Sequence, residues 1–152
     1  MQTTLESLYR QHSTGVYRFA LSILRSPQDA EDVTQETFLR TVKDGSFRFR
    51  PGKERAFLYT VAKNLCYDIL RDRGREPPAT AEPTTEDSWD MEYLQLLSCL
   101  TDTERSIVTL KLIAGATHAE IAKILGISVS AAKKRYERAI AKVRDACEEG
   151  SI

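Results

Sequence analysis

Residues 117–138, THAEIAKILGISVSAAKKRYER, decide the fold of the C-terminal half. Thr117 followed by Glu120 has the spacing of a capping box, which predicts the start of a short helix. Gly126-Ile127-Ser128 predicts a tight turn, and Ser128 suits the N-cap of the longer basic helix that follows. A short helix, a glycine turn and a longer basic helix are typical of a helix-turn-helix, whose second helix enters the major groove of DNA.

The second helix of this predicted motif carries side chains suited to DNA contact. The small residues Ser130 and Ala131 let the backbone approach closely. Arginine can pair with both guanine acceptors, whereas lysine on a phosphate mainly positions the protein. A solvated basic face on a terminal helix would have the same composition, but the capped preceding helix favours DNA binding. The candidate DNA contacts are Thr117, Ser128, Ser130, Ala131, Lys133, Lys134, Arg135 and Arg138.

Helical periodicity continues outward from this motif, and the weak strand signal predicts an all-α protein. Further helices are expected from Leu5 to near Arg25, Pro27 to Val42, Lys53 to Arg73, Met91 to Leu100, and Thr101 to before Gly115. The proline-rich acidic stretch at 75–90 predicts a flexible linker. We therefore expect two small helical domains, residues 1–74 and 91–148, joined by this linker.

Charge is distributed unevenly, although the chain is neutral overall. Residues 40–75 hold ten basic and four acidic side chains, and residues 105–152 hold nine and five. Residues 76–104 hold eight acidic side chains and no basic one. Because a polyanion meets local fields rather than the total charge, the two basic segments still permit DNA binding.

The sequence argues against several other classes of protein. Cys66, Cys99 and Cys147 are odd in number and widely spaced, so we expect neither a disulfide framework nor a metal site, and leave a redox role open. No apolar run is long enough to span a bilayer and no signal peptide is evident, so a cytoplasmic protein without membrane insertion is expected. His12 and His118 lie far apart, and no nucleophile motif, phosphate loop or cofactor motif is present, so we expect no enzyme.

Two segments resemble the sigma-70 family of RNA polymerase sigma factors. The stretch DAEDVTQETFLR at 29–40 resembles the family's most characteristic segment, and THAEIAKILGIS at 117–128 resembles its C-terminal helix-turn-helix. The small size matches the extracytoplasmic-function (ECF) group. The resemblance implies a factor that binds the polymerase core, recognises promoters and helps open DNA, with the helix-turn-helix at the −35 element.

The resemblance assigns the helix from Pro27 to Val42 to docking on the clamp helices of the polymerase's largest subunit. An acidic helix face suits a basic partner. A solvated acidic face, stabilised by the helix dipole, would have the same composition. The implied core contacts are Asp29, Asp32, Gln35, Glu36 and Leu39.

The resemblance also assigns the loop after this helix, and the helix that follows, to the −10 element. Opening a duplex needs a basic track for the backbone and a stacking surface for an unpaired base. For any single aromatic side chain, core packing is the alternative. The implied contacts are Phe47, Arg48, Phe49, Arg50, Lys53, Arg55, Tyr59, Lys63, Asn64, Tyr67, Asp68 and Arg71.

The linker and the overall function each have an alternative interpretation. In the family the linker threads toward the polymerase active site and RNA exit path, but a solvated acidic tether explains its composition equally well. Family members are commonly held by an anti-sigma factor, which is therefore an expected partner. Glu137, beside the DNA-facing side, departs from the family pattern, so promoter preference cannot be transferred. The alternative function is a stand-alone helix-turn-helix regulator, which usually needs a dimer interface that the sequence does not suggest.

Overall fold

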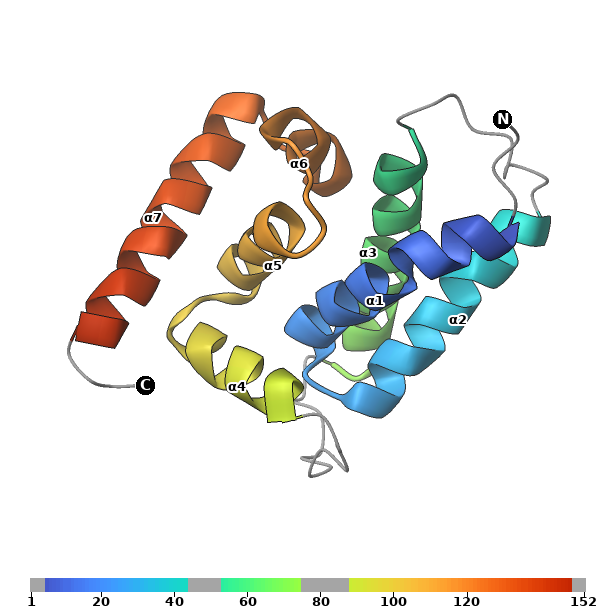
Figure 1. The fold of residues 1–152 in the computed structure, drawn as a ribbon, viewed down its shortest axis with the longest axis horizontal. Coiled ribbons are helices and arrows are strands. Elements are labelled where there is room, and N and C mark those ends of the chain that lie inside the picture. Colours follow the sequence, from blue (N-terminus) through green and yellow to red (C-terminus); the bar gives the residue numbers. More distant parts are fainter. Residues whose placement is uncertain (1–4, 44–52, 75–87, 149–152) are drawn as a thin grey trace.

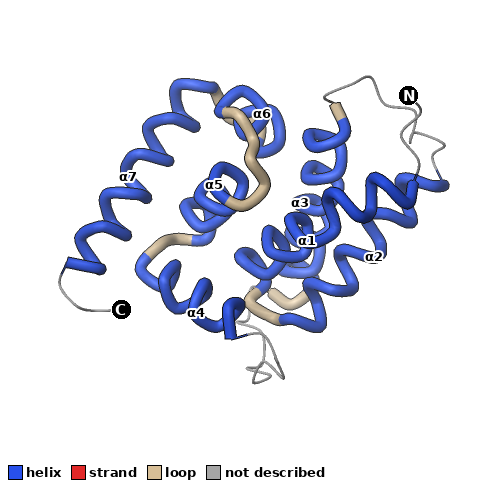
Figure 2. Tube along the Cα trace, in the orientation of Figure 1, coloured by secondary structure: helices blue, strands red, loops and turns tan. Residues whose placement is uncertain are grey.

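The computed structural model describes residues 5–43, 53–74 and 88–148, and each element within these ranges is helical (Figures 1 and 2). The N-terminal half contains α1 (Leu5–Leu24), α2 (Pro27–Lys43) and α3 (Glu54–Asp72). The C-terminal half contains α4 (Ser88–Leu96), the 3-10 turn η1 (Leu97–Cys99), α5 (Asp102–Leu112), α6 (His118–Leu125) and α7 (Val129–Glu148). The prediction of an all-α protein with two helical domains is confirmed.

Side-chain caps set the helix starts that the sequence predicts. The Ser26 hydroxyl accepts the Asp29 N–H at 3.3 Å at the start of α2. Thr101 and Thr117 both form complete capping boxes, which open α5 and α6. The Ser128 hydroxyl accepts the Ala131 N–H at 3.0 Å at the start of α7. Because each cap satisfies backbone donors that the helix leaves free, it fixes where the helix begins.

The helix after the linker differs from the expected one at both ends. It begins at Ser88, three residues before the expected Met91, so the end of the expected linker is helical. Its last turn tightens into the 3-10 helix Leu97–Cys99, and Leu100 then leaves the helix with an extended backbone. The next residue, Thr101, is the N-cap of α5 and has the extended backbone that an N-cap requires.

Helices α1, α2 and α3 bury apolar stripes against one another. Leu8, Val16 and Phe19 of α1 are fully buried, and Val33 of α2 and Leu58 of α3 join them. Three threonines of α2 are also buried, and each hydroxyl donates to the carbonyl four residues earlier; they are Thr34, Thr37 and Thr41. Because these hydroxyls are satisfied within the helix, the polar side chains do not penalise burial.

The two halves pack together and share one hydrophobic core, which the sequence did not predict. Helix α5 packs against α1, and α6 packs against α3 (Figure 1). One buried cluster contains Phe19 and Leu58 from the N-terminal half together with Ile107 and Ile121 from the C-terminal half. In the described structure the halves therefore form one closed arrangement.

A buried arginine of α5 joins the two halves. Arg105 is 4% exposed, and its Nε donates to the Ser22 carbonyl of α1 at 3.0 Å. Its other nitrogens donate to the Leu100 carbonyl at 2.5 Å and to the Asp102 carboxylate. Burial, with a contribution from Arg25, lowers the pKa of Arg105 to about 10. These bonds satisfy the guanidinium in a place where an unpaired charge would be costly.

Candidate functional site

The outer face of α2 presents most of the residues expected to contact the polymerase. Asp32 and Gln35 are exposed, Glu36 is half-buried, and Leu39 is 53% exposed. Glu36 accepts Arg40 Nε at 3.2 Å on the surface, a contact that water and salt weaken. These four side chains, Asp32, Gln35, Glu36 and Leu39, define the α2 docking face.

Asp29 differs from the other residues expected to contact the polymerase. Its carboxylate accepts Arg73 Nη1 from the end of α3 at 2.5 Å, and its side chain is 16% exposed. The bond raises the pKa of Arg73. Asp29 therefore links α2 to α3 within the N-terminal half.

Apolar side chains extend the α2 docking face toward the start of α1. Leu5, Tyr9 and Val42 are exposed large hydrophobic residues, and they line a groove with Phe38 and Leu39. The rings of Tyr9 and Phe38 meet edge to face with centroids 5.0 Å apart. We call these five residues the apolar end patch. Sequence reasoning found only Leu39, although the one-turn spacing of Leu5 and Tyr9 offered a signal.

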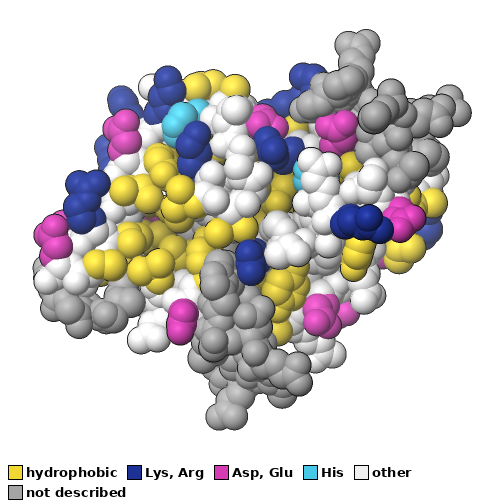
Figure 3. Space-filling view, in the orientation of Figure 1, with side chains coloured by type: hydrophobic (Ala, Val, Ile, Leu, Met, Phe, Trp, Pro, Cys, Tyr) yellow, Lys and Arg dark blue, Asp and Glu magenta, His cyan; other side chains and the backbone are white. Residues whose placement is uncertain are grey.

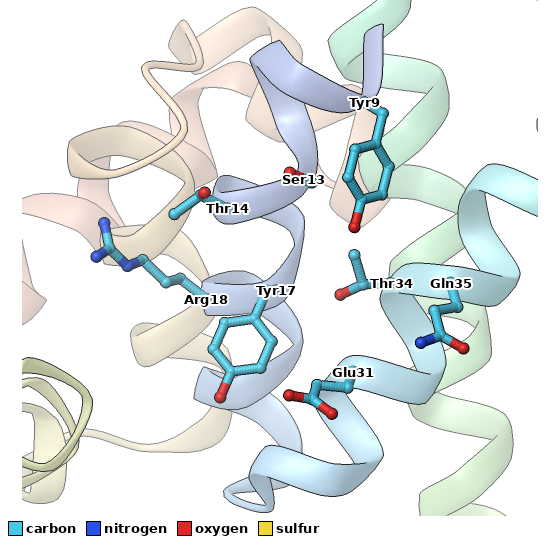
Figure 4. Close-up of a pocket in the computed structure, with 8 residues that line it drawn as sticks. All are labelled: Tyr9, Ser13, Thr14, Tyr17, Arg18, Glu31, Thr34 and Gln35. Carbon is cyan, nitrogen blue, oxygen red and sulfur yellow. The ribbon is translucent and has the colours of Figure 1, made fainter. Parts of the chain in front are cut away.

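A polar cleft continues this surface between α1 and α2 (Figure 4). In Figure 4, Tyr17 of α1 and Glu31 of α2 point into the gap between the two helices. Tyr9 and Gln35 line both this cleft and the groove formed at the apolar end patch. The α1–α2 side thus offers one continuous surface that changes from apolar to polar along its length.

Four of the residues expected at the −10 element share an exposed side of α3. Asn64, Tyr67, Asp68 and Arg71 recur at helical spacing and are exposed, with Tyr67 41% exposed. Arg71 donates to Asp68 at 2.5 Å. Lys53 is also exposed, just before the helix. The amide, phenol and basic groups of this side are accessible to a partner.

Arg55 and Lys63 lie on another side of α3, where they contact α6. Arg55 Nη1 pairs with the Glu120 carboxylate at 3.0 Å, and Lys63 Nζ donates to the Ile124 carbonyl at 2.7 Å. Burial raises the pKa of Glu120, but the Thr117 N–H and the charge of Arg55 outweigh it and hold that pKa below its ordinary value. Two predicted DNA contacts are therefore already bound to the C-terminal half.

The prediction that Tyr59 offers a stacking surface is corrected by the structure. Tyr59 is 1% exposed and packs edge to face on Phe19, with ring centroids 5.4 Å apart. Its hydroxyl lies against α1 at Gly15, where an added Cβ would come within 2.2 Å. Burial raises the pKa of this hydroxyl. Tyr59 is a core residue in this arrangement.

Four further expected contacts, Phe47, Arg48, Phe49 and Arg50, lie outside the described residues. The same is true of linker residues 75–87.

The helix-turn-helix forms as predicted from α6, its turn and α7. Gly126 ends α6 with φ 69°, a left-handed conformation that glycine adopts without strain. Ala132 and Ala139 are buried on the inner side of α7, and the His118 and Tyr136 rings meet with centroids 5.7 Å apart. These contacts fix how α7 is presented.

The candidate DNA contacts of this half lie mainly on the exposed surface. Those that are exposed are Thr117, Ser128, Ser130, Lys133, Lys134, Arg135 and Arg138, and Ala131 is half-buried. Ser128 also caps α7 through its hydroxyl, so its side chain has a structural role. The arrangement leaves a row of basic groups on α7 accessible to a polyanion.

Hydrophobic side chains gather between α5 and α7 on the face shown in Figure 3. They belong to a second cluster whose buried members are Tyr93, Leu97, Leu100, Val108 and Ala139. Ile113, Ile140 and Val143 pack against it and are only partly buried. Tyr93 donates to or accepts from Thr109 at 2.6 Å, which holds α4 against α5.

The part of the chain that the structure describes contains no group of three or more His, Cys, Asp or Glu side chains that could hold a metal ion. No helix among residues 5–43, 53–74 and 88–148 is long and apolar enough to cross a membrane.

Family models match both halves of the chain. Residues 8–76 match Sigma-70 region 2, and residues 90–143 match Sigma-70, region 4. The first match covers the α2 docking face and α3, and the second covers the helix-turn-helix.

Several named proteins align with most of the chain. The ferric citrate uptake sigma factor FecI of Escherichia coli is 33% identical, covering 90% of this chain and 87% of that protein. The RNA polymerase sigma factor CarQ of Myxococcus xanthus is 32% identical, covering 95% and 89%. The ECF RNA polymerase sigma factor SigE of Mycolicibacterium smegmatis is 29% identical over 92% of this chain, which spans 60% of SigE.

Solved structures resemble the whole fold. The sigma factor RpoE of Bartonella quintana, in complex with the anti-sigma factor NepR, superposes with a TM-score of 0.78 at 21% identity, covering 94% of this chain and 96% of that one. CnrH, in complex with the cytosolic domain of CnrY, superposes with a TM-score of 0.71 at 25% identity, covering 95% and 88%.

Proposed function

The chain belongs to the sigma-70 family of RNA polymerase sigma factors, in its extracytoplasmic-function group, and on that premise we propose how its surfaces serve promoter recognition. The α2 docking face binds the clamp helices of the largest polymerase subunit. The exposed side of α3 binds the −10 element, and α7 binds the −35 element. Nucleotidyl transfer belongs to the polymerase, and the protein acts in the cytoplasm, where polymerase and chromosome are found.

One observation carries this proposal: the exposed face of α2 and the exposed basic face of α7 occupy separate parts of one small chain. The α2 docking face joins polar side chains to the apolar end patch, which suits a protein partner with apolar and basic groups. Helix α7 carries exposed cations on a braced helix-turn-helix, which suits the major groove. A factor that brings polymerase to DNA needs both.

The chemistry of α3 and α7 supports separate DNA tasks. Tyr67 and Asn64 offer a ring and an amide to an unpaired base, and Arg71 lies beside them. On α7, Arg135 and Arg138 are exposed and carry guanidinium groups, which can pair with both guanine acceptors, while the ammonium groups of Lys133 and Lys134 suit phosphates. Opening and recognition are thus divided between the two halves.

An anti-sigma factor is a further proposed partner. RpoE and CnrH resemble this chain across both halves; RpoE was solved with the anti-sigma factor NepR, and CnrH with the cytosolic domain of CnrY. A stand-alone DNA-binding regulator is not favoured, because the α2 docking face and the apolar end patch would then have no partner.

Retention on core RNA polymerase tests the proposal. The triple variant Asp32→Ala, Gln35→Ala, Glu36→Ala removes two exposed polar groups and one half-buried one from the α2 docking face. We expect its affinity for core to fall about tenfold or more, because contacts at the centre of an interface dominate binding. The matched control is Asp145→Ala, Gln95→Ala, Glu92→Ala, which removes the same three residue types from exposed positions of α4 and α7. Equal retention of both folded variants would contradict the assigned docking face.

A further inference from the structure

We propose that Asp29 is a positioning residue, whose ion pair with Arg73 fixes α3, the helix assigned to the −10 element, against α2, the helix assigned to the polymerase. This inference rests on the proposed function and deepens it. It gives a different role to the expected polymerase contact that does not belong to the α2 docking face. We call Asp29 and Arg73 together the α2–α3 ion pair.

The α2–α3 ion pair joins the first turn of one helix to the end of the other. The Asp29 carboxylate accepts Arg73 Nη1 at 2.5 Å. Asp29 lies in the turn that Ser26 caps, and Arg73 directly follows Asp72, the last residue of α3. Figure 1 shows the start of α2 beside the end of α3. The pair therefore closes one end of the packing between these two helices.

Asp29 faces α3 and not the outer surface of α2. Its side chain is 16% exposed, and that of Arg73 is 39% exposed. Burial, and after it the charge of Asp29, raises the pKa of the Cys66 thiol. Cys66 is buried on α3 and precedes Arg73 by about two helical turns, so both lie on the same side of that helix. Asp29 is thus directed along the inner side of α3, where a polymerase contact would not reach it easily.

The surroundings of the α2–α3 ion pair favour a lasting contact. A carboxylate in the first turn of a helix is stabilised by the helix dipole. The hydrogen bond from Asp29 raises the pKa of Arg73. The Arg73 N–H also donates to the Ile69 carbonyl at 3.1 Å, which holds its backbone at the end of α3. Because Asp29 is largely buried, salt should screen this pair less than the exposed Arg40–Glu36 pair on α2.

Promoter opening requires more from this contact than polymerase binding does. The α2 docking face lies on α2, whereas Asn64 and Tyr67, the proposed contacts to an unpaired base, lie on α3. Helices that pack through apolar side chains can slide past one another by small amounts. A binding site has to be held closely in its productive geometry by the residues that support it. Loss of the α2–α3 ion pair should therefore disturb promoter opening more than binding of α2 to the polymerase.

The substitution Asp29→Asn removes the charge of the pair and keeps the size of the side chain. Asp72→Asn is the matched control, because Asp72 is exposed next to Arg73 and takes part in none of the ion pairs that the described residues form. Both variants lose one negative charge from the N-terminal half. On the other helix, Arg73→Gln removes the cation and Arg73→Lys keeps it.

The test uses holoenzyme assembled from the full-length protein and core RNA polymerase, on a promoter mapped by transcription in vitro. We expect Asp29→Asn to bind core within about twofold of wild type, because residues outside an interface contribute little to its binding energy. Permanganate reactivity of unpaired thymines should fall about three- to tenfold, as expected when one coupled pair is lost. Asp72→Asn should match wild type in both measurements, and Arg73→Lys should retain more opening than Arg73→Gln.

Two results would overturn the proposal. A loss of core affinity in Asp29→Asn as large as that of the triple variant Asp32→Ala, Gln35→Ala, Glu36→Ala would mean that Asp29 contacts the polymerase directly. Unchanged promoter opening in Asp29→Asn would mean that the α2–α3 ion pair does not position α3. Urea unfolding of each variant shows that it is folded under the conditions of the assay.

A double-mutant cycle separates positioning from a direct contact between Arg73 and DNA. If Arg73 acts through Asp29, then Arg73→Gln should lower opening little further in the Asp29→Asn background. An equal loss in both backgrounds would overturn the proposal, because Arg73 would then act without Asp29.

The behaviour of wild type separates this inference from the proposed function. Failure of folded wild-type protein to bind core would contradict the sigma role, and this inference with it. Normal core binding and opening by wild type, together with Asp29→Asn indistinguishable from Asp72→Asn, would contradict the positioning role alone.

Discussion

The α2 docking face and the side of α3 that carries Arg55 and Lys63 differ in how far the closed arrangement leaves them open. The α2 docking face is open at Asp32, Gln35 and Leu39, and Leu5, Tyr9 and Val42 of the adjoining apolar end patch are also exposed. Helix α3, in contrast, has Arg55 and Lys63 bound to α6. The face proposed for the polymerase is therefore exposed, whereas two of the cations proposed for DNA are already paired within the chain.

Charge is consistent with the position of α6 against α3, where Ile121 and Ile124 of α6 are also buried in the shared core. The α2 docking face carries carboxylates, and α6 offers a carboxylate and carbonyl oxygens, so these surfaces repel. The inner side of α3 carries cations, which attract the same groups of α6.

Substitutions at two tyrosines of α3 should differ most in their effect on the free energy of unfolding. Tyr59→Ala removes a ring packed on Phe19, and we expect the free energy of unfolding to fall by about 3–5 kcal/mol, as for other large core aromatics. Tyr67→Ala, on the exposed side, should change it by less than about 1 kcal/mol. Urea unfolding measures both. A similar loss in the two variants would mean that Tyr67 is also part of the core.

Tyr67→Ala should instead weaken promoter opening. Stacking of one base on an aromatic ring contributes about 1–3 kcal/mol. Permanganate reactivity of unpaired thymines in holoenzyme complexes measures this loss, with wild-type core binding as the control. Unchanged opening would remove Tyr67 from the −10 contacts.

Arg105→Ala tests whether the closed arrangement depends on the α1–α5 contact. The change leaves the Ser22 and Leu100 carbonyls without a buried donor, and we expect a loss of about 2–4 kcal/mol in the free energy of unfolding. Arg138→Ala, on the exposed side of α7, should stay within about 0.5 kcal/mol of wild type. Chemical denaturation of the full chain measures the difference, and equal stabilities would contradict an anchoring role.

Acid should also lower the free energy of unfolding, by less than the Arg105→Ala substitution does. Burial and the charge of Arg55 lower the pKa of His12, with Glu54 opposing them in part. A lowered histidine pKa gives stability that is present above about pH 6.5 and is lost as pH falls toward the folded-state value. The lowered pKa of Glu120 adds a second loss below about pH 4.3.

Thermal unfolding at several pH values checks whether stability falls as the pH falls. We expect the Tm of wild type to fall between pH 7.5 and 5.5, and the Tm of His12→Gln to fall less over the same range. An identical pH dependence would show that His12 does not contribute.

Local chemistry explains what the sequence predicted well. Caps at Ser26, Thr101, Thr117 and Ser128 satisfy nearby backbone donors, so the starts of α2, α5, α6 and α7 could be located from short patterns. The exposed positions of the α7 cations could also be predicted, because helical periodicity is a local property of the sequence. The residues implied by family resemblance on the α2 docking face lie mostly on one open surface, and their roles stay proposals.

Contacts distant in sequence explain what was missed. Arg55 and Glu120 lie 65 positions apart, and no local pattern pairs them. Tyr59 follows the inward-facing Leu58 and still fits inside, because Gly15 leaves room for its hydroxyl against α1. The shared core arose in the same way, since two amphipathic halves can each bury residual apolar surface against the other.

Transcription in vitro with core RNA polymerase on genomic DNA of the source organism tests the central claim most directly. Wild type should give transcripts that begin at discrete sites preceded by a shared two-block motif, one block for each DNA-binding half. The triple variant Asp32→Ala, Gln35→Ala, Glu36→Ala should give few of them. If folded wild-type protein yields no start sites beyond those of core alone, the account of this chain as a promoter-specificity factor is contradicted.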